Sequence, residues 1–186
     1  MIGFAMCGSF CTHKYALEQL ARLLERGYDV LPIMSENVYS TDTRFGKAAE
    51  LVERVEALCH RGVVHSILDA EPIGPKTVLE AMVVCPCTGN TLAKISAGIT
   101  DTAVTMAVKA HLRGDRPLVL ALASNDALSA NLKNIGQLLV RKCVYFTPMT
   151  QDDPKQKPHS LVADFSLVLP TLDAALQGRQ YQKIFI

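Results

Sequence analysis

The chain has 186 residues, of which 49% are hydrophobic and 20% charged, so it has the length of about one globular domain and enough apolar material for a core. Its 19 Lys and Arg nearly balance its 18 Asp and Glu, and the resulting net charge of +1 argues against nucleic acid or an anionic membrane as a partner. These figures exclude a disordered or fibrous protein and predict one domain over residues 1–186.

In the first half of the chain, short apolar runs alternate with segments of helical spacing. An apolar run at 2–7 breaks at Gly8-Ser9, after which Ala and Leu residues recur at helical spacing from 16 to 24. A second apolar run at 29–34 leads into a polar loop at 35–46 and a second helical pattern at 51–59. The order strand, loop, helix therefore occurs twice, with a glycine after each helix to end it.

The second half of the chain continues this alternation. Further strands are predicted at 81–85, 117–123 and 144–147, and further helices at 90–97, 102–112 and 128–140. A polar, proline-containing connection at about 150–160 precedes a last helix at 160–176. Strands that are apolar on both faces and alternate with helices are typical of a parallel sheet covered on both sides. We predict a single doubly wound, flavodoxin- or Rossmann-like α/β domain.

The loop after the first strand is a candidate phosphate site. In doubly wound sheets the ligand lies beyond the carboxyl ends of the strands. Gly8, Ser9 and Phe10 stand there, before a helix whose N-terminus would stabilise an anion, and Ser35 follows the neighbouring strand. The glycine spacing is not G-x-G-x-x-G, which favours a mononucleotide over a dinucleotide. The alternative is that Gly8-Ser9 is a plain turn.

Small polar residues also follow the third and fourth strands. Pro86, Thr88, Gly89, Asn90 and Thr91 crowd one strand–helix junction, where hydroxyl and N–H groups suit an anion or the polar edge of a ring. The alternative is that Thr88 or Asn90 only caps the next helix. After the fourth strand come Ser124 and Asn125, and an asparagine suits a heterocycle because its amide both donates and accepts hydrogen bonds.

Two cations have two alternative roles each. Arg44 lies in the long loop after the second strand, where it would bind a carboxylate through two guanidinium nitrogens or be solvated. Lys94 would contact the ligand or lie along the surface.

The sequence predicts a cytoplasmic protein with reduced thiols. No apolar stretch reaches the roughly 18 residues of a membrane span, and no basic leader precedes the first apolar run. The cysteine spacings are unusual for zinc, and neither a metal site nor a cysteine nucleophile is predicted.

These loops together resemble a known family. Gly8-Ser9, Pro86-Cys-Thr-Gly-Asn-Thr-Leu-Ala-Lys94 and Leu122-Ala-Ser-Asn125 are similar to the motifs of the homo-oligomeric flavin-containing cysteine decarboxylases and related flavoproteins. The resemblance implies a homo-oligomer that binds FMN. It implies phosphate contacts from the loops after the first two strands, and ring or ribityl contacts from those after the third and fourth. A histidine that acts on the substrate in the decarboxylases has no counterpart in residues 70–76, which argues against cysteine decarboxylation.

One branch of the family resembles the chain nearly end to end, notably at 40–46, 69–76 and 151–154. Members of that branch act with a separate A subunit to oxidise dihydrodipicolinate to dipicolinate in the mother cell of a sporulating bacterium. The A subunit of that branch resembles dinucleotide-binding proteins, which implies that NAD(P) binds to the A subunit. Because the substrate carries two carboxylates, Arg44 is expected to bind one, with Lys76 or Lys94 as second choice. Glu71 is expected as proton acceptor and Asn125 as a catalytic contact.

Three functions are compatible with these features. The chain is a catalytic flavin subunit of a two-protein oxidoreductase, in which a hydride carrier aromatises a dihydropyridine. It is alternatively a non-catalytic partner whose flavin pocket is empty or holds phosphate. As a third possibility it is another flavin-pocket enzyme, of decarboxylase or prenyl-transfer type, and the missing histidine argues against this one.

Overall fold

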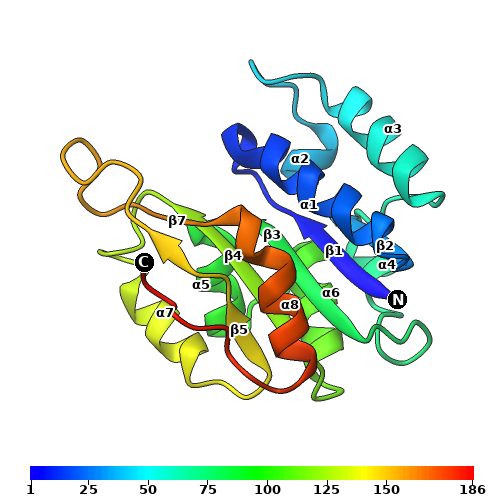
Figure 1. Cartoon of the computed structure of the whole chain (residues 1–186). Coiled ribbons are helices and arrows are strands. Elements are labelled where there is room, and N and C mark those ends of the chain that lie inside the picture. Colours follow the sequence, from blue (N-terminus) through cyan, green and yellow to red (C-terminus); the bar gives the residue numbers. More distant parts are fainter.

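Five parallel strands form a sheet, which lies at the centre of the molecule (Figure 1). The computed structural model describes residues 1–186. The strands are β1 (Ile2–Met6), β2 (Val30–Met34), β3 (Ala81–Cys87), β4 (Leu118–Ser124) and β5 (Val144–Phe146). Hydrogen bonding places them in the order β2-β1-β3-β4-β5, which is that of flavodoxin-like sheets. The predicted doubly wound α/β fold is confirmed, and each expected strand is present with boundaries within two residues.

Two short antiparallel strands extend the sheet, and they correct one prediction. The strands β6 (Met149–Thr150) and β7 (Leu161–Ala163) pair with each other, and β7 also pairs with the end of β4. The sequence pattern places residues 161–163 in the last helix, but α8 spans only Val168–Leu176, after a 3-10 turn η2 (Phe165–Leu167). The Asp164 carboxylate accepts the Ser166 N–H at 3.0 Å, which fixes this late start. The polar connection thus joins two strands.

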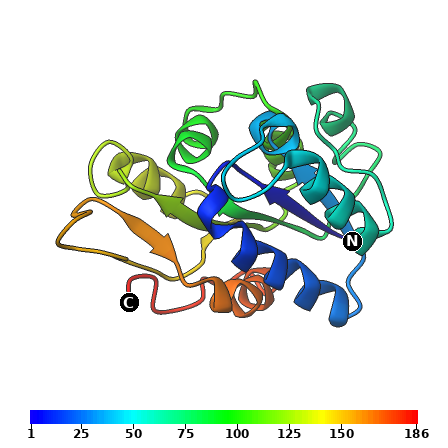
Figure 2. The same ribbon diagram turned by 90° about the horizontal axis from the view of Figure 1, so that it is seen from above.

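Helices cover both faces of the sheet, as Figure 2 shows. The helices α1 (His13–Glu25), α3 (Ala48–Cys59) and α8 bury apolar side chains in one core, which includes Leu20, Val55 and Leu169. The opposite core is covered by α4 (Ile67–Ala70), α5 (Gly89–Ala97), α6 (Ala103–Leu112) and α7 (Leu132–Leu139). None of the helices has both the length and the apolar character that crossing a membrane requires.

Short helical turns stand where loops were expected beside the carboxyl ends of the strands. The 3-10 turn η1 (Phe10–Thr12) leads from β1 into α1, and α2 (Glu36–Ser40) lies within the predicted polar loop after β2. The helix α7 starts four residues later than expected, because residues 126–131 form a turn that ends at its N-cap, Asn131. These turns set the positions of the candidate site residues.

Candidate functional site

The loops after β1, β2, β3 and β4 lie side by side at one edge of the sheet. The Ser35 N–H donates to the Met6 carbonyl at 3.0 Å, which joins the ends of β2 and β1. The Cys7 N–H donates to the Pro86 carbonyl at 3.2 Å, which joins the end of β1 to the end of β3. Gly89, at the start of α5, packs directly against the Ser124 hydroxyl at the end of β4. The structure therefore brings together the predicted cofactor-binding loops.

After β1 and β2, two serine hydroxyls have no capping role. The Ser9 N–H donates to the Cys7 carbonyl at 2.8 Å, but the Ser9 side chain does not cap the helical turn that follows it. Ser35 is the N-cap of α2, and its hydroxyl makes no capping hydrogen bond either. Both residues are partly buried and stand before helical turns on adjacent strands. This pair of free hydroxyls suits the phosphate of a mononucleotide.

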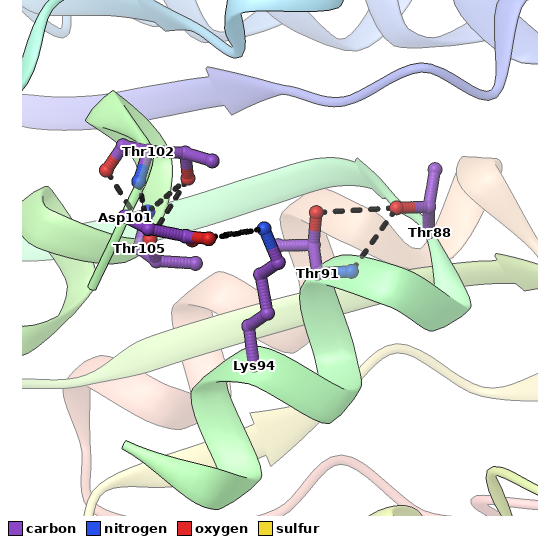
Figure 3. A network of polar contacts seen from close by, with 6 residues as sticks. All are labelled: Thr88, Thr91, Lys94, Asp101, Thr102 and Thr105. Atoms are coloured by element: carbon purple, nitrogen blue, oxygen red, sulfur yellow. Dashed lines mark hydrogen bonds and ion pairs between the residues drawn. The ribbon is translucent and has the colours of Figure 1, made fainter. Parts of the chain in front are cut away.

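The start of α5 is occupied by a hydrogen-bonded network, shown in Figure 3. Thr88 is the N-cap, since its hydroxyl accepts the Thr91 N–H at 3.3 Å and donates to the Thr91 hydroxyl at 3.1 Å. One turn further on, the Lys94 ammonium lies 2.8 Å from both carboxylate oxygens of Asp101, and this hydrogen bond lowers the pKa of Asp101. Lys94 is thus paired within the chain, and Thr88 does cap a helix.

A second network closes the end of β4. The Ser124 hydroxyl donates to Asp126 at 2.5 Å, and the Asn131 amide donates to both Asp126 oxygens at 2.9 Å. The Ser124 bond is the main cause that holds the pKa of Asp126 below its ordinary value. A Cβ on Gly89 would lie 2.7 Å from Asp126 Oδ1 and 2.7 Å from Asn131 Nδ2. A carboxylate therefore stands beside the N-terminus of α5, and only a glycine fits there.

The part that Asn131 and Asp126 play was missed by sequence reasoning. Asn131 stood inside a predicted helix, and only the Ser-Asn-Asp sequence at 124–126 signalled a turn with side-chain hydrogen bonds. The two asparagines predicted to contact a ring, Asn90 and Asn125, are exposed and belong to neither network. They are therefore available to a ligand at the rim.

The thiols of Cys7, Cys85 and Cys87 are buried, whereas Cys11, in the turn after β1, is exposed. Burial raises the pKa of Cys7 to about 11, and it also raises the pKa values of Cys85 and Cys87. His13 Nε2 donates to the Cys7 carbonyl at 2.9 Å when that nitrogen carries the proton, and desolvation lowers the pKa of His13. Because neither a thiolate nor an imidazolium forms readily here, these cysteines act as small apolar side chains, as expected.

Arg44 lies near this edge, on the loop between α2 and α3. Backbone hydrogen bonds of 3.0 and 3.1 Å link Thr43 and Gly46, and the Arg44 guanidinium lies 4.8 Å from the centroid of the Phe45 ring. This turn borders a groove of about 480 Å³ between α1 and α3, which we call the α1–α3 groove. Phe10, from the turn after β1, lines the same groove. Arg44 is thus exposed, close to the predicted phosphate loop.

Glu71 and Lys76 lie toward the opposite end of the sheet. The segment that contains them packs against the end of α6, where Gly74 approaches the Ala110 carbonyl. It returns to the start of β1, where the Glu80 N–H donates to the Met1 carbonyl at 2.9 Å. In Figure 1 this loop and α4 stand next to the N-terminus. Within a single chain, Glu71 and Lys76 therefore lie away from the edge of the sheet that holds the other predicted site residues.

The strand order and the grouped loops are those of a flavodoxin-like α/β protein with a candidate ligand site at the carboxyl edge of its sheet. Comparison with known proteins gives the family. The model of the family described as Flavoprotein matches residues 1–164, and the chain belongs to that family. It is similar to the B subunit of dipicolinate synthase from Bacillus subtilis, with 43% identity over 185 residues that cover 100% of this chain and 92% of the relative. Among solved structures it is similar to the B subunit of dipicolinate synthase from Bacillus halodurans, with a TM-score of 0.91, 42% identity, and coverage of 100% and 95%.

A more distant likeness shows the fold alone. The crystal structure of AnUbiX in complex with FMN and dimethylallyl pyrophosphate has a TM-score of 0.64 and 22% identity to this chain, with 79% and 76% of the two chains covered. Decarboxylases and a prenyltransferase thus share this architecture with the B subunits of dipicolinate synthases. The family and its members support a flavin-type enzyme, whereas the partner, the substrate and the reaction lie beyond these likenesses.

Proposed function

We propose that this chain is the B subunit of a dipicolinate synthase, which acts with an A subunit to oxidise dihydrodipicolinate to dipicolinate. The observation that carries the proposal is the end-to-end similarity to the Bacillus subtilis protein, with no segment of this chain left uncovered. The similarity of the folded chain to the Bacillus halodurans protein, over its whole length, supports it. The reaction removes two hydrogens from a dihydropyridine, and a bound FMN would supply the hydride acceptor.

The proposed cofactor is FMN, held at the edge formed by the loops after β1 to β4. Its phosphate would bind to Gly8, Ser9, Phe10 and Ser35, because the two serine hydroxyls have no capping role. The α5 side is unfavourable for the phosphate, since the Asp126 carboxylate stands there. The ring or ribityl part would instead contact the loops after β3 and β4, through Pro86, Thr88, Gly89, Asn90, Thr91, Ser124 and Asn125.

The residues of this chain would bind and orient the substrate rather than carry out the redox step. We propose that Arg44 binds a carboxylate, because its guanidinium is exposed beside the phosphate loop and in no ion pair. Lys94 is a weaker choice, since Asp101 already pairs with it. Asn125, exposed at the end of β4, would orient a ring through its amide. Lys76 and the proton acceptor Glu71 would reach the site only from another copy in a homo-oligomer.

The proposal also covers the oligomeric state of the chain, its cellular location and the cofactor of the A subunit. We propose a homo-oligomer in the cytoplasm of the mother cell, and NAD(P) bound by the A subunit as the final hydride carrier. The balanced charge of the chain fits a protein partner and a small dicarboxylate better than nucleic acid.

Reconstitution of the two subunits tests this function. The purified chain is expected to be yellow with bound FMN, and dipicolinate should form from dihydrodipicolinate only when both subunits are present. A colourless chain that does not bind added FMN would favour the non-catalytic partner instead. Full activity of the A subunit alone would exclude the catalytic role.

A further inference from the structure

The α1–α3 groove lies beside the strand-end loops and, of the residues proposed to hold FMN, includes only Phe10. One wall is the face of α1 that carries His13, Lys14 and Leu17, and the opposite wall is the first half of α3 with Lys47 and Arg54. Its volume of about 480 Å³ is within the range of small-molecule sites. The groove therefore has room for a ligand apart from the proposed flavin site.

The groove is positively charged in a chain that is nearly neutral. Lys14, Lys47 and Arg54 line it, against the single carboxylate of Glu50. None of the three cations forms an ion pair within the chain, although six other ion pairs are present. The whole chain has a net charge of only +1. An excess of unpaired cations in one hollow attracts an anion locally.

The positions of the cations indicate more than one anionic group. Lys14 belongs to α1, where its ammonium lies 4.5 Å from the centroid of the Tyr15 ring, whereas Lys47 and Arg54 belong to the α3 side, so cationic residues line the hollow on both walls. A single small anion would contact the cations of one wall only, whereas a ligand with two carboxylates would contact the cations of both walls. His13 adds no charge, because its burial lowers its pKa.

Two aromatic rings line the groove. Phe45 is 55% exposed, and its backbone N–H donates to the Thr43 hydroxyl at 3.1 Å within the hydrogen-bonded 43–46 turn. Phe10 lines the groove from the side of α1 and contacts the His13 ring at a centroid distance of 5.1 Å. An exposed ring on a fixed turn suits contact with a planar ring of a ligand.

We propose that the α1–α3 groove binds a planar ring that carries two carboxylates, with the ring against Phe10 and Phe45 and the carboxylates toward Lys14, Lys47 and Arg54. This inference rests on the proposed function and goes beyond it, because it gives the dicarboxylate a docking site beside the proposed phosphate loop. Arg44, on the same turn as Phe45, would then contact one of these carboxylates from the rim, which agrees with the role proposed for it above.

Binding to the full chain tests the site. Pyridine-2,6-dicarboxylate and its non-chelating analogue benzene-1,3-dicarboxylate are titrated by calorimetry at low salt, and both are expected to bind. Arg54→Ala and Lys14→Ala should each weaken binding about tenfold, and benzoate should bind about tenfold more weakly than the dicarboxylate, since each charge-assisted contact contributes on this scale. Arg22→Ala is the matched control, because Arg22 is also an exposed cation of α1 but lines a different hollow. It should leave the affinity unchanged.

Parallel titrations with FMN and inorganic phosphate separate the possible failures. If FMN binds but neither dicarboxylate does, or if Arg54→Ala leaves the dicarboxylate affinity unchanged, the groove site is wrong and the proposed function stands. If Arg54→Ala releases FMN, or FMN competes with the dicarboxylate, the groove belongs to the flavin and the inference is overturned. Phosphate that binds as tightly as the dicarboxylates would also overturn it, because the ring would then contribute nothing.

Discussion

The loops after β3 and β4 differ sharply from the loops after β1 and β2, although all four lie at one edge of the sheet. After β3 and β4 the polar groups bind one another: Thr88 caps α5, Lys94 pairs with Asp101, and Asp126 accepts three hydrogen bonds. After β1 and β2, the Ser9 and Ser35 hydroxyls cap nothing. Polar groups of the first region stabilise the fold, whereas those of the second are free for a ligand.

Substitutions in the hydrogen-bonded networks of the first region should therefore change stability, whereas substitutions at free polar groups, namely Ser9, Ser35 and the exposed Asn125, should change binding. Displacing one member of a partly buried network lowers the free energy of unfolding, because its partners lose hydrogen bonds that water replaces incompletely. A free hydroxyl at a helix N-terminus can be replaced with little effect on folding, but its loss removes a contact to an anion.

The largest expected effect on stability is that of Gly89→Ala. The added Cβ would overlap the Ser124 hydroxyl and approach Asp126 and Asn131, so the Asp126 network must move, at a cost of about 2–3 kcal/mol in the free energy of unfolding. Urea denaturation measures it. The control is Gly136→Ala within α7, where no atom lies within 4 Å of the new Cβ and stability should rise by about 0.5–1 kcal/mol. Equal stability of Gly89→Ala and wild type would contradict the tight packing.

Asp126→Asn should have the next largest effect and change the acid dependence of folding. The folded pKa of Asp126 is lowered mainly by the Ser124 hydrogen bond, so its contribution is complete above the unfolded pKa of about 3.9 and is lost as pH falls through the lower folded pKa. The variant should lose about 1–2 kcal/mol at pH 7 and should respond less than wild type to acidification below pH 4. Denaturation midpoints at pH 7 and pH 3 would show this, and parallel acid responses of the two proteins would refute it.

Asn125→Leu should weaken FMN binding without unfolding the chain. Asn125 is exposed and belongs to none of the networks, so the melting temperature should stay close to that of wild type. Loss of its hydrogen bonds should reduce FMN affinity about tenfold, which corresponds to about 1.4 kcal/mol. Fluorescence titration with FMN provides the measurement. An unchanged affinity would remove Asn125 from the site.

The smallest expected effect is that of Lys94→Gln. The pair with Asp101 is partly exposed, with 56% of the Asp101 side chain open to solvent, so its loss should lower the free energy of unfolding only slightly, and less than Asp126→Asn does. Lys133→Gln, at an exposed lysine of α7 that forms no ion pair, is the control and should be neutral. A loss for Lys94→Gln as large as that for Asp126→Asn would mean that the network in Figure 3 is more strongly coupled than its exposure suggests.

The sequence predicted the sheet well because the five parallel strands are apolar runs with glycine-ended helices between them. It did not predict β7, since Leu161–Ala163 is apolar and continuous with the apolar residues of α8, and its pairing partner Ala123 is remote in the chain. Asp164, as the cap of the following turn, was the one local signal.

Candidate site residues were predictable where they follow a parallel strand directly. Ser9, Ser35 and Asn125 do so, and the sheet brings their loops to one edge. Glu71 and Lys76 do not follow a strand, and the path of their segment back to the start of β1 depends on contacts with α6 that no local pattern encodes. The α1–α3 groove likewise depends on the spacing of two helices.

The most direct test of the account is the affinity of the chain for FMN when Ser9 carries a negative charge. In a fluorescence titration, wild type should bind FMN, and Ser9→Asp should bind it about a hundredfold more weakly, because the new carboxylate repels the phosphate. Gln177→Asp, which adds the same charge at an exposed position after α8, should bind as wild type does. FMN binding by Ser9→Asp at wild-type affinity would contradict the placement of the phosphate after β1, and with it the role proposed for the free hydroxyls of Ser9 and Ser35.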